Sequence, residues 1–136
     1  LVASSQDITY TDAYQQAQEE NVRRGISEHI RSDAVNKTIN PEKQSRHILD
    51  SDGYVAGKSY LLDGVNAQEL VDKYANTGRA ELTSSGNWKN KETVTADMHI
   101  GVRVDPNTLE GTLTNRFVIH YSRTGTHIVP TKPLGR

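Results

Sequence analysis

The sequence predicts an α+β fold: two helices packed on one face of a roughly four-stranded antiparallel sheet, with an N-terminal helical arm. Two observations support this class. Apolar residues recur at helical spacing before residue 79 and largely alternate with polar residues after it. Turn-forming segments also separate the alternating stretches at short intervals, which is typical of antiparallel strands that bury one face and leave the other open.

Composition limits the function classes. The 136 residues suffice for one domain plus an appended segment, and a formal charge of −1 gives no global basic field that would attract a polyanion. Any contact with nucleic acid must therefore come from a local basic patch. The absence of cysteine excludes disulfides and thiolate metal sites, and no apolar run reaches membrane-spanning length. The chain begins at Leu1 without a signal-peptide pattern, and we interpret it as a fragment of a longer protein.

Residues 1–38 form the predicted arm. The stretch 11–34 lacks proline and consists mostly of Gln, Glu, Arg, Ala and Ser. Its apolar residues recur about every four positions, which indicates a helix with a narrow apolar stripe: Tyr14, Ala17, Val22, Ile26 and Ile30. Two interpretations stay open. The arm is a linker from a carrier protein, or it dimerises or docks on the domain.

Residues 39–136 contain the predicted domain, which opens with a helix. Asn40 can cap its N-terminus, Pro41 suits the first helical position, and the helix is expected to reach about Leu49. Lys43 and His47 are four residues apart and would share one face of that helix.

A short strand is expected over 58–62, followed by a second helix. Asn66 begins a capping-box pattern, and Leu70, Val71 and Tyr74 lie on one side of the helix that follows. Gly78 is the expected C-cap.

The later strands predict an open polar face. In the stretch 98–104, the apolar residues Met98, Ile100, Val102 and Val104 alternate with polar neighbours, and in 116–122 Phe117, Ile119 and Tyr121 would point inward. The open face would then carry the remaining polar residues of both strands: His99, Arg103, Arg116, His120 and Ser122.

The register of the closing hairpin decides which residues join His120. A three-residue loop ending at Gly125 pairs Ser122 with Thr126, which puts Thr126 on the face of His120. A two-residue loop pairs Ser122 with His127 instead, because a shift of one residue exchanges the two faces. The glycine at the last loop position favours the first register and Thr126, with His127 as the alternative.

Imidazoles beside cations suit phosphate chemistry. One histidine can accept a proton, another can donate one, and Lys or Arg can stabilise charge on a phosphoryl group. The plain alternative is a solvated sheet face. A zinc site built from His99, His120 and His127 lacks ligand spacing, and the sequence has no P-loop, dinucleotide-binding glycine pattern or GxSxG motif.

Several segments resemble the type-50 domain of bacterial polymorphic toxins, which is also appended to some phage minor head proteins of the Mu-F type. The segments are INPEKQSRHI at 39–48, GKSYLL at 57–62, AQELVDKYANTGRAEL at 67–82, WKNKETV at 88–94 and TNRFVIHYSRTGTHIVPT at 114–131. The resemblance implies a ribonuclease-like toxin of the barnase/EndoU/colicin/RelE superfamily. Such a toxin cleaves RNA without a metal or other cofactor, leaves a 2′,3′-cyclic phosphate, and is secreted or virion-associated but acts in the bacterial cytoplasm.

The resemblance also implies site residues and partners. The motif positions present in this chain are Lys43, His47, Lys58, Arg116, His120, Ser122 and Thr126. We expect His120 and His47 to act as general base and acid in an unassigned order, and Lys43 and Arg116 to stabilise the phosphorane. Ser122 and Thr126 would bind the phosphate or orient a histidine, while Lys58, Arg103 and His127 would contact substrate.

The expected partners are an RNA such as a tRNA, a cognate immunity protein and a carrier protein, with no membrane. Two other functions are alternatives. The first is a non-catalytic phage or surface module that binds a protein. The second is an ADP-ribosyl transferase, which the lack of a glutamate on a late strand disfavours.

Overall fold

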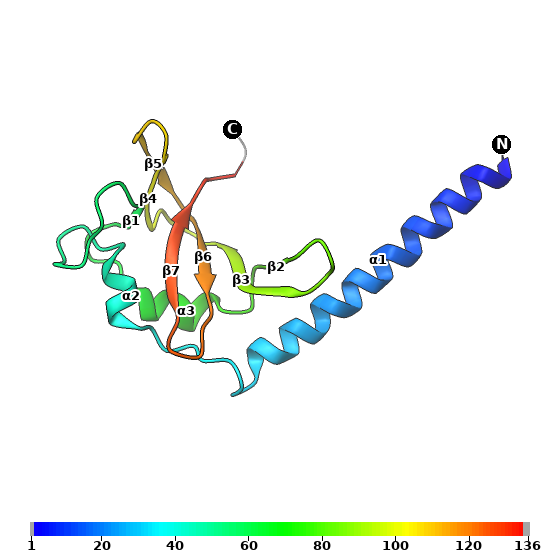
Figure 1. Cartoon of the computed structure of the whole chain (residues 1–136), viewed down its shortest axis with the longest axis horizontal. Coiled ribbons are helices and arrows are strands. Elements are labelled where there is room, and N and C mark those ends of the chain that lie inside the picture. The colour runs from blue at the N-terminus through cyan, green and yellow to red at the C-terminus, as the bar shows by residue number, and fades with distance from the viewer. Residues whose placement is uncertain (1, 135–136) are drawn as a thin grey trace.

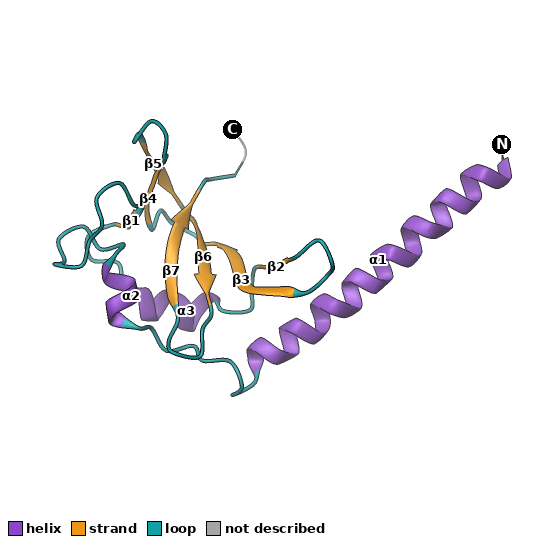
Figure 2. Ribbon diagram, in the orientation of Figure 1, coloured by secondary structure: helices purple, strands orange, loops and turns teal. Residues whose placement is uncertain are grey.

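The computed structural model describes residues 2–134 and has the predicted α+β architecture (Figures 1 and 2). The helices are α1 (Val2–Arg31), α2 (Pro41–Ser45) and α3 (Ala67–Tyr74). The strands are β1 (Tyr60–Leu61), β2 (Arg79–Leu82), β3 (Trp88–Thr95), β4 (Gly101–Val104), β5 (Gly111–Thr114), β6 (Arg116–His120) and β7 (His127–Thr131). In Figure 1, α1 leads away from the remaining elements as a long rod.

A four-stranded antiparallel sheet in the order β2-β3-β6-β7 forms the centre of the domain. Phe117, Ile119 and Ile128 are fully buried on one face, where the Tyr74 ring of α3 packs edge-on against Phe117 at a centroid distance of 6.0 Å. The predicted inward side of β6 is thereby confirmed. The opposite face carries polar side chains and is not covered by α3.

The strand predicted over 98–104 does not join this sheet. Residues 101–104 form β4, which belongs to a second, three-stranded sheet in the order β1-β4-β5. Met98 is 65% exposed and lies outside the strand, so its predicted inward position is wrong. Gly101 allows the second sheet to approach β7, because a Cβ atom there would lie 2.6 Å from the Pro130 ring.

The helix caps follow the sequence with two corrections. Asn40 caps α2 by accepting hydrogen bonds from the backbone N–H groups of residues 42 and 43, and Asn66 caps α3. Helix α2 ends at Ser45 rather than near residue 49, because the N–H groups of His47 and Ile48 donate to the carbonyls three residues earlier instead of four, and the His47 carbonyl accepts from the Leu61 N–H of β1. Gly78 is not the C-cap of α3; left-handed Asn76 follows the cap residue instead.

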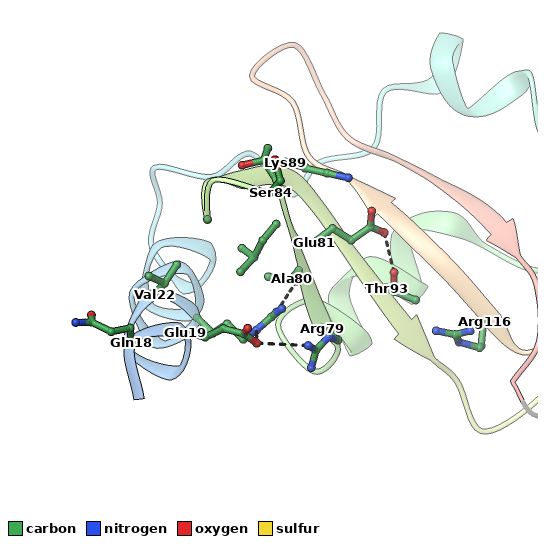
Figure 3. Close-up of a pocket in the computed structure, with 14 residues that line it drawn as sticks. Gln18, Glu19, Val22, Arg79, Ala80, Glu81, Ser84, Lys89, Thr93 and Arg116 are labelled. Atoms are coloured by element: carbon green, nitrogen blue, oxygen red, sulfur yellow. Dashed lines mark hydrogen bonds and ion pairs between the residues drawn. The ribbon is translucent and has the colours of Figure 1, made fainter. Parts of the chain in front are cut away.

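The last turns of α1 dock on the domain. Ile30 is 2% exposed and belongs to the hydrophobic core, and Arg23 donates a hydrogen bond to the Ala80 carbonyl on the edge strand β2. Glu19 and Arg79 form an ion pair at 3.5 Å beside a groove of about 590 Å³ between the arm and the sheet (Figure 3). No helix within residues 2–134 has the length and hydrophobicity to cross a membrane.

Candidate active site

The β6–β7 hairpin pairs His120 directly with His127. Residues opposite each other in an antiparallel pair share a face, so the two imidazoles lie together on the open face. Neither predicted register has this pairing. Thr126 is fully buried and donates its hydroxyl to the Asn36 carbonyl, so its predicted place beside His120 is wrong.

Contacts with the segment 36–40 set this register. The N–H of Thr126 donates to the Thr38 carbonyl, and the N–H of Asn40 donates to the Thr126 carbonyl. Gly125 has a positive φ of 117°, and a Cβ atom there would lie 2.6 Å from the Asn40 side chain. The loop is therefore shaped by a segment more than eighty residues earlier, which the hairpin sequence alone does not reveal.

Three imidazoles form a nearly parallel stack that we call the histidine cluster: His47, His127 and His120. The ring centroids of His120 and His127 are 4.6 Å apart with an interplanar angle of 18°. Those of His47 and His127 are 5.8 Å apart with an angle of 10°. His127 lies between the other two, so the cluster joins the end of α2 to both strands of the hairpin.

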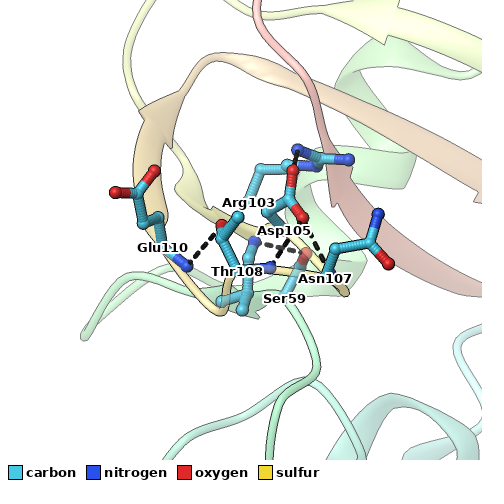
Figure 4. A network of polar contacts seen from close by, with 7 residues as sticks. Ser59, Arg103, Asp105, Asn107, Thr108 and Glu110 are labelled. Atoms are coloured by element: carbon cyan, nitrogen blue, oxygen red, sulfur yellow. Dashed lines mark hydrogen bonds and ion pairs between the residues drawn. The ribbon is translucent and has the colours of Figure 1, made fainter.

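The second sheet fixes the orientation and tautomer of His47. Its Nδ1 atom lies 2.9 Å from the Ser59 carbonyl oxygen, which can only accept, so neutral His47 carries its proton on Nδ1. The Nε2 atom then keeps its lone pair and can accept a proton. Ser59 is itself held by the N–H of Val104, which donates to its hydroxyl, next to the β4–β5 loop network in Figure 4.

Burial lowers the pKa of all three imidazoles and so favours their neutral form. It lowers the pKa of His120 to about 4, with a further lowering by nearby Lys91 and an opposing effect of Glu81. It also lowers the pKa of His127 to about 4, assisted by the two neighbouring imidazoles and by Lys43 and Arg46. The pKa of His47 is lowered by burial as well, and Lys58 and Arg46 lower it further. Because each cation close enough to matter acts against protonation, a bound anion would reverse the balance.

Four cations lie near the histidine cluster: Lys43, Arg46, Lys58 and Lys91. They form the kind of local basic patch that a chain with a net charge of −1 would need in order to contact nucleic acid. Within the described residues, none of the four forms an ion pair. The ammonium group of Lys43 donates to the hydroxyls of Ser122 and Thr124, at 3.2 and 2.8 Å. Lys43 and Ser122, both expected at the site, are thus in direct contact, and Thr124, which was not expected there, binds the same ammonium group.

Gln44 holds this helix against the sheet. Its side-chain amide is buried, donates to the Ile128 carbonyl at 2.9 Å and accepts from the Ile128 N–H at 2.7 Å. Ile128 belongs to the edge strand β7, so Gln44 satisfies backbone groups that no further strand pairs. Sequence reasoning missed Gln44 because a polar residue between two others on a short helix carries no sign of burial.

Three predicted residues lie away from the histidine cluster. Arg116 is four residues from His120 along β6, a separation of about 13 Å. Its guanidinium donates to the Lys132 carbonyl and lines the groove beside α1 (Figure 3). Arg103 belongs to the second sheet and pairs with Asp105 at 3.3 Å (Figure 4), while His99 is exposed before β4. The open face thus does not unite the five residues expected on it.

The stacked arrangement also bears on metal binding. In a stack, the ring faces rather than the nitrogen lone pairs meet, whereas a metal ligand set needs several lone pairs directed at one point. Within residues 2–134, no group of three His, Asp or Glu side chains is arranged to hold a metal ion. The cluster is therefore better suited to moving protons than to ligating a metal.

Comparison with known proteins adds one match. The model of a family described as bacterial toxin 50 matches residues 39–130, which include every member of the histidine cluster and its four cations. The match begins at residue 39, so the whole arm (residues 1–38) lies outside it. A search of curated proteins found no match to the chain.

Proposed function

The chain belongs to the bacterial toxin 50 family, and we propose that its toxic activity is metal-independent endonucleolytic cleavage of RNA at the histidine cluster. The observation that carries this proposal is the stack of three neutral imidazoles beside Lys43, on the face that α3 leaves open. The cluster offers proton acceptors, proton donors and unpaired positive charge in one place. RNA brings its own nucleophile, the 2′-hydroxyl.

His47 is the proposed general base. Its Nε2 lone pair removes the proton of a 2′-hydroxyl, whose oxygen attacks the adjacent phosphorus and forms a new P–O bond. His120, protonated, donates to the leaving 5′-oxygen as the P–O5′ bond breaks. The products are a 2′,3′-cyclic phosphate and a 5′-hydroxyl. The negative charge of the bound phosphodiester raises the pKa of His120, so that its imidazole takes up from solvent the proton that it later donates.

The other residues have supporting roles. Lys43 stabilises negative charge on the phosphorane, and the hydroxyls of Ser122 and Thr124 orient its ammonium group. His127 stacks between His47 and His120 and keeps the two rings at a fixed distance from each other. Lys58 contacts the RNA backbone. Arg116 and Thr126 have no role in this mechanism. Arg116 lies about 13 Å from His120 along β6, and Thr126 is fully buried and bonded to the Asn36 carbonyl.

The cellular setting follows from the same proposal. We propose that residues 1–38 link the toxin domain to a secreted or virion-borne carrier, and that an immunity protein protects the producing cell. A chain of charge −1 with one basic patch suits a structured substrate such as a tRNA better than indiscriminate binding to RNA.

Incubation with total RNA tests the activity. The wild-type chain should cleave it in the presence of EDTA and leave ends that carry 2′,3′-cyclic phosphate. His47→Ala and His120→Ala should each lower the rate by about 10²–10⁴-fold. His99→Ala is the matched control and should cleave normally, because His99 is exposed outside the cluster. A non-catalytic protein-binding module would degrade no RNA and cause no toxicity when expressed, and that result would refute the proposal.

A further inference from the structure

A second hollow lies next to the histidine cluster, at the junction of the hairpin loop, the β3 strand and the end of α1. It has a volume of about 490 Å³, within the range of small-molecule sites. Its walls include Trp88, Tyr121 and His29, and also Ser122 and Thr124, whose hydroxyls bind Lys43. The hollow and the proposed catalytic site therefore share a wall.

The aromatic walls are arranged around Trp88. The centroids of the Trp88 and Tyr121 rings are 5.6 Å apart, and the His29 ring meets Trp88 edge-on at 5.9 Å. Two hydrogen bonds fix the larger rings. The indole N–H of Trp88 donates to the Lys91 carbonyl, and the Tyr121 hydroxyl donates to buried Glu92. His29 is exposed and is held by no side-chain hydrogen bond within the described residues, so its ring can move aside.

A bulge in β3 turns polar groups toward the hollow. Leu82 pairs with Trp88 whereas Ala80 pairs with Glu92, so β3 has two more residues than β2 between these pairs. At the bulge Asn90 adopts a left-handed conformation with φ of 61°, which is uncommon outside glycine. Bulges of this kind often re-aim side chains beside functional sites.

Two polar side chains of the hollow have no internal partner. The amide of Asn90 and the guanidinium of Arg123 line it and make no hydrogen bond or ion pair to other described residues. An amide and a guanidinium can each form paired hydrogen bonds with the edge of a base, while aromatic rings stack on its face. An unpaired nucleobase can make both contacts at once, with its edge toward Asn90 and Arg123 and its face against an aromatic ring.

We infer that this hollow is a nucleobase-binding subsite, in which an unpaired base of the RNA stacks against Trp88 and is hydrogen-bonded by Asn90 and Arg123. The phosphate attached to that nucleotide would lie toward Lys43, because Ser122 and Thr124 belong to both sites. The inference rests on the proposed function for its substrate, and it adds that cleavage depends on the base beside the scissile phosphate.

Tryptophan fluorescence tests the subsite without any cleavage. Trp88 is the single tryptophan of the chain, so its emission reports from this hollow alone. The four nucleoside 3′-monophosphates are titrated into the full chain, with a free tryptophan amide as the reference for light absorbed by the nucleotides. At least one nucleotide should quench Trp88 saturably. Inorganic phosphate and ribose 5-phosphate, which have no base, should leave its emission unchanged.

Two variants locate the binding. Arg123→Ala should weaken binding of the preferred nucleotide by about 10- to 100-fold, as expected for the loss of a charged hydrogen bond. Asn90→Gly should weaken it by about 2- to 10-fold, as expected for a neutral hydrogen bond, since glycine accepts the left-handed backbone and only the amide is removed. Arg31→Ala is the matched control, because Arg31 is exposed at the end of α1 and lies outside the hollow.

The outcomes separate this inference from the proposed function. Quenching that both pocket variants weaken establishes the subsite even if the chain cleaves no RNA, in which case only the nuclease proposal falls. If none of the four nucleotides quenches Trp88 saturably over the titration, the subsite is overturned even if RNA is cleaved. Quenching that neither Arg123→Ala nor Asn90→Gly alters also overturns it.

Discussion

Gln44 offers the sharpest test of how the site is assembled. Its amide is the buried link between α2 and the edge strand β7, with one hydrogen bond in each direction to the backbone of Ile128. The neighbouring Lys43 reaches the hairpin loop, and His47 reaches the face of His127. Gln44→Ala should therefore destabilise the domain and separate the parts of the site together.

The expected loss can be worked from these two bonds. The substitution leaves a buried N–H and a buried C=O on β7 without partners, and each such group costs about 1–3 kcal/mol. The free energy of unfolding should thus fall by about 2–6 kcal/mol. Gln68 provides a matched control, since its amide also binds backbone in both directions, at Ile39 and Lys37, but is only partly buried. Water can replace its bonds, so Gln68→Ala should lose only about 1 kcal/mol.

Urea unfolding of the two variants and the wild type measures these losses, and hydrogen exchange of the Ile128 amide reports the local effect. RNA cleavage by Gln44→Ala should also fall further than cleavage by Gln68→Ala, because only the first substitution touches the link between α2 and β7. A Gln44→Ala variant with less than about 0.5 kcal/mol of destabilisation and wild-type protection of the Ile128 amide would refute the reasoning.

Three further predictions follow from the same geometry. NMR titration should place the ring pKa values of His120 and His127 well below 6.5. In the unfolded chain these two rings take up protons at a higher pH than in the folded chain, so the free energy of unfolding should fall as the pH decreases from about 6.5 toward 4. Equal stability at pH 7.5 and 5 would contradict the burial of the rings. Lys43→Met should lower kcat/KM for RNA by about 10²–10³-fold, whereas Arg116→Ala should change it less than threefold; equal losses would argue against the positions assigned to these cations. Tyr121→Phe should cost about 1–2 kcal/mol of stability by removing the bond to Glu92; unchanged stability in urea would argue against that bond.

The sequence predicted those parts of the fold that depend on local signals. Asn40 and Asn66 cap their helices because a cap needs only the side chain and the two or three residues that follow it. The alternation along 116–122 correctly identified the buried side of β6, because one covered face imposes a period of two. The α+β class follows from these two kinds of signal.

The predictions were wrong where contacts with distant segments of the chain determine the strand register or the sheet to which a strand belongs. The hairpin register depends on bonds between Thr126 and residues 36 and 38, which have no signature in the turn itself. Strand β4 pairs with β1 and β5 instead of joining the larger sheet, and Gly101 lets it pack against Pro130, a contact that alternation in 98–104 cannot reveal. Lys91 was missed for the same reason, since its place opposite His120 requires knowing that β3 pairs with β6.

The candidate site and the edge of the sheet depend on the same turn of helix. Within five residues, α2 and the turn after it direct Lys43 to the hairpin loop, Gln44 to the backbone of β7 and His47 to the histidine cluster. A helix of five residues has little stability of its own, so its position comes from the cap at Asn40 and from Gln44. Because the cap residue also donates its amide to the Thr124 carbonyl, the hairpin loop and the helix hold each other. The proposed catalytic groups are thus ordered by contacts that also close the open edge of the sheet, and a substitution that loosens this edge should reduce stability and activity together.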